Sequence, residues 1–145
     1  MHEVDPGYLG YWSGEEVVVF LKSLLEQERI GTRAFADIGY AADLHVADLI
    51  LESELDQGSI CILLENEIAK KGEVAPARRK RSAHERRAEF TLEQAVAFAR
   101  SNQADLLKTI ENALLNVFDS ELSSLLLTML QLHRKQIVQL EILGK

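Results

Sequence analysis

A helical stripe in the first third of the chain constrains the fold more than any other feature. Between Val17 and Ile38, an apolar or small side chain recurs every three or four residues, which places these side chains on one face of an α-helix. The one exception on this stripe is Glu28. A carboxylate on the buried face of a helix is costly unless other groups hydrogen-bond to it or balance its charge. The stripe therefore predicts a helical core that contains a polar partner for Glu28.

The composition favours an all-α fold in one domain. The chain has 145 residues, of which 47% are hydrophobic, and this is enough for one sizeable core. It contains only 2 proline and 8 glycine residues, which is too few for the many turns of an all-β fold. We therefore interpret residues 1–145 as a single domain.

Charge, cysteine content and hydropathy suggest where such a chain works. Its formal net charge of −7 argues against a general nucleic-acid-binding protein. Cys61 is the only cysteine, so an internal disulfide cannot form, which is typical of proteins in a reducing cytoplasm. The start of the chain lacks the apolar run of a signal peptide, and no apolar run is long enough to span a bilayer. We expect a cytoplasmic protein that has no membrane partner.

Capping patterns and glycines predict four helices. Ser13 and Thr91 each begin a capping-box pattern, with a glutamate or glutamine three residues later. Gly39 and Gly72 are suitable ends for the first and second helices. The predicted helices cover residues 14–39, 41–71, 92–116 and 120–142. Short connections after the first and third helices, and a long one after the second, predict a four-helix up-down bundle with a crossover between the second and third helices.

The segment before the first helix, residues 1–12, is an aromatic N-terminal arm that contains Tyr8, Tyr11 and Trp12. Aromatic side chains bury a large area per residue. We interpret the arm as an apolar strap over the bundle or, alternatively, as part of a dimer contact.

The long connection, residues 72–90, is a basic crossover loop. From Lys70 to Arg87 the chain has 8 Lys or Arg residues against 2 Asp or Glu residues. The cluster at 78–87 can be a phosphate or nucleic-acid patch, or a solvated loop that offsets the acidic helices. No aromatic residues are interleaved with it to stack on bases, so we favour the solvated loop and expect no nucleic-acid partner.

Each predicted helix carries polar residues near the middle of its apolar stripe. These residues are Glu28, Glu54, Gln57, Gln103 and His133. Helical residues three apart project to the same side, so Glu54 and Gln57 are expected to point the same way. We predict that all five form a polar layer in the core. Gly31 and Gly58 lie within one turn of this layer and are expected to leave space there for water, an ion or a small ligand.

The polar layer partly matches helical bundles that bind two metal ions. Such bundles use one glutamate from each of two helices and Glu-x-x-His from the other two. In this chain Gln57 stands in place of a histidine, Gln103 in place of a bridging carboxylate, and Leu130 in place of the carboxylate that accompanies His133. Two interpretations remain open. Amide and imidazole groups can satisfy Glu28 without metal, or Glu28, Glu54 and His133 can hold one divalent ion such as iron.

The chain resembles the ferritin-like superfamily, and more closely small bacterial ferritin-like domains of unknown function. The resemblance rests on four stretches: Ser23–Phe35, which contains the run LLEQERIGTRAF, Leu55–Ile68, Arg100–Leu107 and Met129–Ile137. It implies a ferritin-like four-helix fold with a degenerate di-iron site, and it assigns no activity.

No catalytic motif accompanies this pattern. The chain has no Gly-rich phosphate loop, no G-x-S-x-G and no CxxC, and His45 and Cys61 lack partners at a metal or catalytic spacing. The sequence therefore does not specify an enzyme. Our leading hypothesis is a non-catalytic binding or interaction module without a cofactor, which forms a homodimer through exposed apolar positions of the second helix and the aromatic arm. The alternative is a metal-binding or redox protein with a reduced ferritin-like site.

Overall fold

A computed structural model of the chain describes residues 10–78 and 90–144, and this part is all-helical, without any strand. The helices are α1 (Gly14–Ala41), α2 (Leu44–Lys70), α4 (Leu92–Leu114) and α5 (Ser120–Leu143). The predicted all-α class and the number of long helices are confirmed. Gly39 does not end α1 as predicted, because the helix continues to Ala41. Gly72 does follow the end of α2, with a positive φ of 75° that favours glycine.

Polar side chains begin each helix by accepting hydrogen bonds from free backbone N–H groups. The Ser13 hydroxyl accepts from the backbone nitrogen of Glu16 at 3.2 Å, and the Glu16 carboxylate accepts from the backbone nitrogen of Ser13 at 3.1 Å. This is the predicted capping box, and Thr91 begins α4 in the same way. Asp43 and Asp119 cap α2 and α5.

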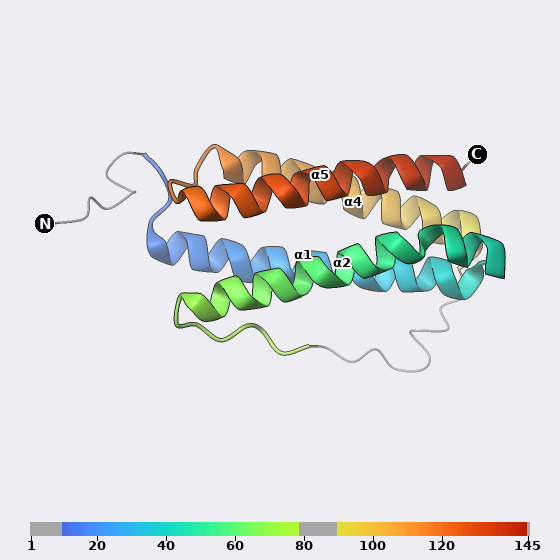
Figure 1. Cartoon of the computed structure of the whole chain (residues 1–145), viewed down its shortest axis with the longest axis horizontal. Coiled ribbons are helices and arrows are strands. Elements are labelled where there is room, and N and C mark those ends of the chain that lie inside the picture. The colour runs from blue at the N-terminus through green and yellow to red at the C-terminus, as the bar shows by residue number, and fades with distance from the viewer. Residues whose placement is uncertain (1–9, 79–89, 145) are drawn as a thin grey trace, which may run out of the picture.

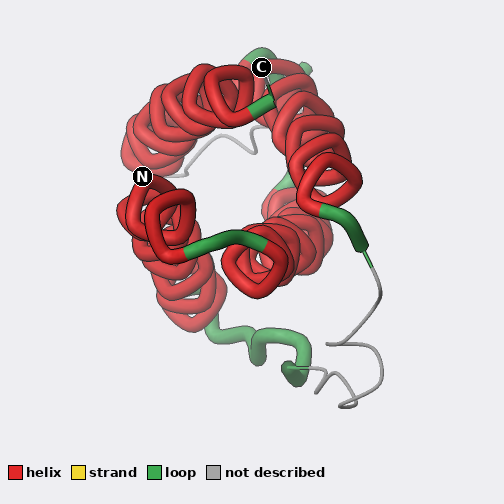
Figure 2. Tube along the Cα trace, turned by 90° about the vertical axis from the view of Figure 1, so that its right-hand side faces the viewer, coloured by secondary structure: helices red, strands yellow, loops and turns green. Residues whose placement is uncertain are grey.

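The four helices lie around a common axis, as Figure 2 shows in a view along the bundle. α1 packs against α2 and α4, and α5 packs against α4 and, less extensively, against α2. The colours in Figure 1 show that α1 and α5 run in one direction and that α2 and α4 run in the other, so each packed pair is antiparallel. α2 ends at one end of the bundle and α4 begins at the opposite end, so successive helices do not alternate strictly.

The apolar core is divided into two clusters of buried side chains. One is built of large aliphatic residues, among them Leu21, Leu24, Leu64, Ile110 and Leu126. The other contains several small residues, among them Ala34, Ala95 and Ala99, packed with Phe35 and Ile50. On every helix the residues of the two clusters are separated by a buried polar side chain. The bundle therefore has a polar centre between two apolar halves.

The described part of the aromatic arm packs on the bundle. The Trp12 ring lies 4.9 Å from that of Phe20, and the Tyr11 ring lies 5.4 Å from that of Phe118. For Tyr11 and Trp12 these contacts agree with the apolar strap. Tyr8 lies outside the described residues.

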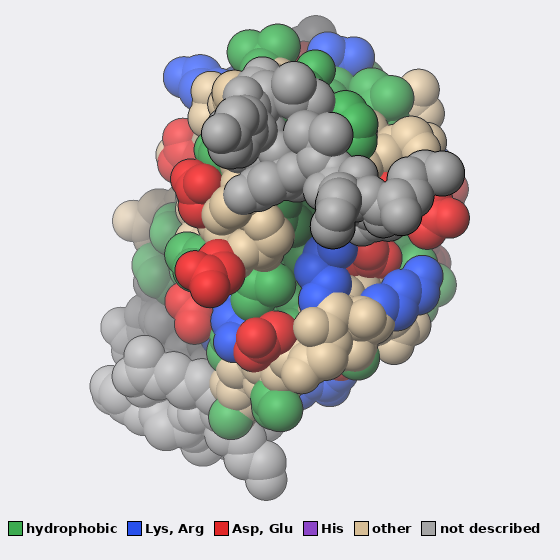
Figure 3. All heavy atoms as spheres, turned by 90° about the vertical axis from the view of Figure 1, so that its left-hand side faces the viewer, with side chains coloured by type: hydrophobic (Ala, Val, Ile, Leu, Met, Phe, Trp, Pro, Cys, Tyr) green, Lys and Arg blue, Asp and Glu red, His purple; other side chains and the backbone are tan. Residues whose placement is uncertain are grey.

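The surface carries charges of both signs. Figure 3 shows acidic and basic side chains interspersed with apolar ones at the end of the bundle where α1 begins. Of the predicted basic cluster at 78–87, only Arg78 belongs to the described residues, and its guanidinium lies 3.0 Å from the Glu65 carboxylate. Among the described helices, none combines the length and the apolar character needed to cross a bilayer.

Candidate functional site

Four polar side chains, one from each helix, meet at the centre of the bundle. They are Glu28 on α1, Gln57 on α2, Gln103 on α4 and His133 on α5, and all four are 0% exposed. We call these four residues the polar ring. Each lies on the buried stripe of its helix, so the apolar packing that forms the bundle also brings them together.

Hydrogen bonds close the ring. Gln57 Nε2 donates to Glu28 Oε1 at 2.6 Å and to the backbone oxygen of Glu28 at 2.9 Å. Gln103 Nε2 donates to Gln57 Oε1 at 3.3 Å. His133 lies 2.5 Å from Gln103 Oε1 through Nδ1 and 2.7 Å from Glu28 Oε2 through Nε2. Each side chain therefore contacts both of its neighbours in the ring.

These contacts determine how many protons the ring holds. Gln103 presents its oxygen to His133, so the Nδ1 atom of that histidine carries a hydrogen and donates it. One more proton lies between His133 Nε2 and Glu28 Oε2, on either the imidazole or the carboxyl group. In both forms the pair has no net charge. This neutrality allows two ionisable groups to occupy a centre that water does not reach.

A glycine makes room for the ring. A Cβ atom on Gly31 would lie 2.6 Å from Gln57 Nε2 and 2.9 Å from Asn102 Oδ1, so only a hydrogen fits at this position. The expectation that Gly31 leaves free space is therefore wrong, because Gln57 and Asn102 fill it. Gly58 faces away from the ring, and a Cβ atom there would meet nothing within 4 Å.

Glu54 does not join the ring, although the sequence placed it in the polar layer. Its carboxylate oxygen lies 2.8 Å from the Cβ position of Gly39. Gly39 is eleven residues from Glu28 along α1, or about 16 Å at 1.5 Å per residue. Burial raises the pKa of the Glu54 carboxyl group. The three predicted metal ligands Glu28, Glu54 and His133 are therefore not assembled.

In the described ranges 10–78 and 90–144, no three or more His, Cys, Asp and Glu side chains are grouped so that they could hold a metal ion. Glu28 and His133 form a pair of ionisable ligands, and the other two members of the ring are amides. The metal hypothesis stays a prediction that rests on this pair.

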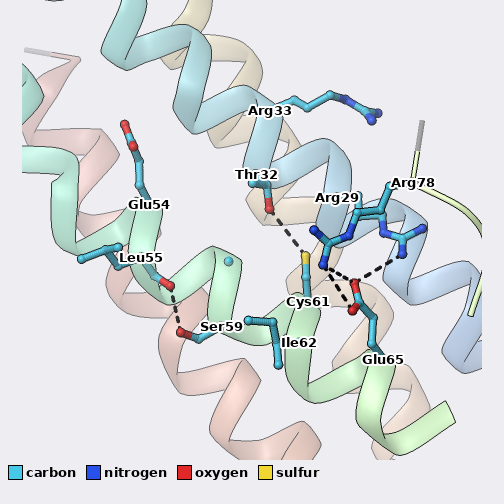
Figure 4. A pocket seen from close by; sticks show the side chains of 11 residues that line it. Arg29, Thr32, Arg33, Glu54, Leu55, Ser59, Cys61, Ile62, Glu65 and Arg78 are labelled. Carbon is cyan, nitrogen blue, oxygen red and sulfur yellow. Dashed lines mark hydrogen bonds and ion pairs between the residues drawn. The ribbon is translucent and has the colours of Figure 1, made fainter. Parts of the chain in front are cut away.

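A surface groove of about 490 Å³ lies between α1 and α2, beside the ring (Figure 4). The Thr32 hydroxyl and the Cys61 thiol lie 3.5 Å apart in it, and Thr32 also donates to the backbone oxygen of Glu28 at 3.2 Å. Burial raises the pKa of the Cys61 thiol, which keeps it protonated and unreactive at neutral pH. Leu55 and Ile62 contribute apolar surface on the α2 side.

Sequence reasoning missed two features of this region. Gln136 is only 1% exposed, and its Nε2 donates to the backbone oxygen of Ser53 at 3.4 Å, one turn from the ring. The signal was available, since Gln136 follows His133 by three residues on the same face. The groove had no comparable signal, because it depends on how far α1 and α2 stand apart at their outer edges.

Comparison with known proteins identifies the family. A family model described as "Domain of unknown function (DUF6306)" matches residues 15–142, a range that contains the polar ring, the groove and all of the four helices except Gly14 and Leu143. A search of curated proteins and a search of solved structures each found no match. The chain therefore belongs to the DUF6306 family.

Proposed function

We propose that this domain is a non-catalytic interaction module whose bundle is closed by a metal-free polar ring. One observation carries the proposal: every side-chain nitrogen and oxygen of the ring has a hydrogen-bond partner within the ring. His133 Nε2 must give up such a bond before it can bind a metal ion, and each Glu28 oxygen already accepts one. The ring satisfies Glu28 with groups that the chain itself supplies.

We also propose that the fold is ferritin-like and that the ring is a degenerate di-iron site. The resemblance of the helices to that superfamily supports this, together with the long connection between α2 and α4 that separates the two helical pairs. Gln57 and Gln103 stand on the helix faces that carry metal ligands in di-iron bundles. Their amides provide one donor and one acceptor each to the ring.

A second candidate is a protein that binds one divalent ion, such as iron, for storage or redox chemistry. The contact of 2.7 Å between Glu28 and His133 favours it, because a carboxylate and an imidazole are both ordinary metal ligands. The ion would have to replace the proton that the pair shares. Amide oxygens would then be its remaining donors from the ring, and these are weak ligands for iron.

Metal analysis separates the two candidates. The chain is purified without chelators, and its iron, manganese and zinc contents are measured together with the shift in Tm when each ion is added. We expect far less than one ion per chain and no shift, since an ion that binds the folded state raises Tm. One equivalent of metal that is lost in Glu28→Gln but retained in Glu26→Gln, an exposed position on α1, would overturn the metal-free ring.

A further inference from the structure

The outer face of α2 carries a row of exposed aliphatic side chains. Leu44, Leu51, Leu55 and Ile62 are 86%, 51%, 63% and 53% exposed. We call these four residues the outer stripe. Their spacing of seven, four and seven residues places them in a sector about 40° wide and about 27 Å long on the helix. Single exposed aliphatic residues are ordinary, whereas an aligned row of them is characteristic of surfaces that bind another molecule.

Gly58 lies on the same outer face of α2 as the stripe. Packing within this chain does not explain why a glycine occupies this position. Gly31 and Gly39 lack side chains because the ends of Gln57 and Glu54 occupy the space. Around Gly58 the space is open, although glycine lowers helix stability relative to alanine. A small residue on an exposed helix face lets the backbone of a partner helix approach closely. Gly58 therefore points to a partner outside the chain.

The outer stripe is continuous with the α1–α2 groove. Leu55, Gly58 and Ile62 line the groove, and Leu55 and Ile62 are also members of the stripe (Figure 4). A helix laid along α2 would cover the stripe and fill the groove at the same time. One partner helix would therefore be enough to occupy both features.

The spacing of the stripe fits a second copy of the same helix. The order seven, four, seven is the same in both directions along the chain. When two α2 helices are laid antiparallel about a twofold axis level with Ser53, Leu44 faces Ile62 of the second copy and Leu51 faces Leu55 of the second copy. A self-complementary surface is the requirement for a twofold interface.

Three carboxylates on the two flanks of the stripe have cationic partners in their own chain. On one side the carboxylates of Glu52 and Asp56 lie 2.5 Å and 4.0 Å from Lys135 Nζ. On the other side Glu65 lies 3.4 Å from Arg29 and 3.0 Å from Arg78. These acidic groups are compensated within their own chain, so two copies can approach without unbalanced like charges at these positions.

We propose that two copies of this chain associate through the outer stripe, with their α2 helices antiparallel and in contact at Gly58. This inference rests on the proposed role as an interaction module and names its partner. Separate experiments can refute the two proposals. The metal content of the purified chain tests the metal-free ring, and the molecular mass in solution tests the dimer through the outer stripe.

Sedimentation equilibrium of the full chain tests the interface. We expect a dimer for the wild type and a dissociation constant raised roughly tenfold or more by Leu55→Glu, since a charge would enter the centre of the contact. Val138→Glu, at a position on α5 that is 56% exposed, is the matched control and should leave the dimer intact. Circular dichroism of both variants confirms that the fold is retained. A wild-type monomer at high micromolar concentration, or equal effects of the two variants, would overturn the proposal.

Oxidative cross-linking tests the orientation. Chains with Leu44→Cys and chains with Ile62→Cys are mixed and oxidised, with Cys61 replaced by alanine in both. Antiparallel pairing predicts disulfides that join one variant to the other, whereas parallel pairing predicts disulfides between two chains of the same variant.

Gly58→Ala tests the contact at Gly58. It should raise Tm under conditions in which the chain is monomeric, because the new methyl group meets nothing, and it should weaken the dimer. A dimer that Gly58→Ala leaves equally tight would contradict contact at Gly58.

Discussion

The polar ring predicts that two substitutions of the same residue, Glu28→Gln and Glu28→Ala, differ strongly in their effect on stability. In Glu28→Gln the new amide oxygen accepts from Gln57 Nε2, and the new amide nitrogen donates to Nε2 of a neutral His133. The ring then stays closed without any charge. In Glu28→Ala both contacts, at 2.6 Å and 2.7 Å, are lost.

The expected magnitudes follow from these contacts. After Glu28→Ala, Gln57 keeps its bond to the backbone oxygen of residue 28, whereas His133 Nε2 has no partner left. Removing one partner of a buried pair lowers the free energy of unfolding by about 3–5 kcal/mol. For a domain of this size that corresponds to a fall in Tm of roughly 10–20 °C. Glu28→Gln leaves one amide hydrogen unpaired and should cost only about 1 kcal/mol.

Urea unfolding followed by far-UV circular dichroism at neutral pH measures both values. Glu26→Gln and Glu26→Ala are the matched controls, since Glu26 is exposed on the same helix and should change stability by less than about 0.5 kcal/mol. Equal destabilisation by Glu28→Gln and Glu28→Ala would show that the charge of Glu28, rather than the closed hydrogen-bond ring, stabilises the centre. A neutral, self-satisfied ring would then be refuted.

Three further substitutions test other parts of the structure. Gly31→Ala should lower the free energy of unfolding by about 1–3 kcal/mol in urea titrations, because its methyl group displaces Gln57; a neutral effect would mean that the close contact is absent. Ser13→Ala should cost about 1 kcal/mol through loss of the α1 cap, compared with Ser23→Ala at an exposed position inside α1 as control. Glu54→Gln should stabilise the chain slightly at neutral pH, since folding raises the pKa of Glu54 above its ordinary value of 4.5. That gain should disappear as the pH falls below 4.5, where the carboxyl group is protonated in both states, and a gain that is independent of pH would contradict burial as its cause.

The polar ring could be predicted from the sequence because helical periodicity determines which residues face the core. Glu28, Gln103 and His133 each interrupt an apolar stripe, so their burial follows once the helices are assigned. The helix starts at Ser13 and Thr91 were predictable for a local reason, since a capping box involves only four neighbouring residues. Both kinds of signal are contained within a single helix.

Features that depend on the distance between helices could not be predicted in this way. Glu54 and Gln57 are three residues apart, and both side chains were expected to join the polar layer. The Glu54 carboxylate instead lies beside Gly39, while the Gln57 amide lies in the ring. Gly31 and Gly58 look alike in sequence, but one is filled by a neighbouring side chain and the other faces open space. The rotation of α2 about its own axis decides both outcomes, and that rotation is a property of the whole bundle.

The two amides explain how the ring can close without metal. Around the ring Gln57 and Gln103 each donate once and accept once. The Glu28–His133 pair accepts from Gln57, donates to Gln103 and shares one proton, so donors and acceptors are equal in number wherever that proton lies. A carboxylate in place of either glutamine would set one acceptor against another and add a negative charge to a fully buried centre. Only a further proton or a cation could then restore the balance. The two amides are thus the groups that allow four buried side chains to satisfy one another, and this is the physical basis of the proposed metal-free ring.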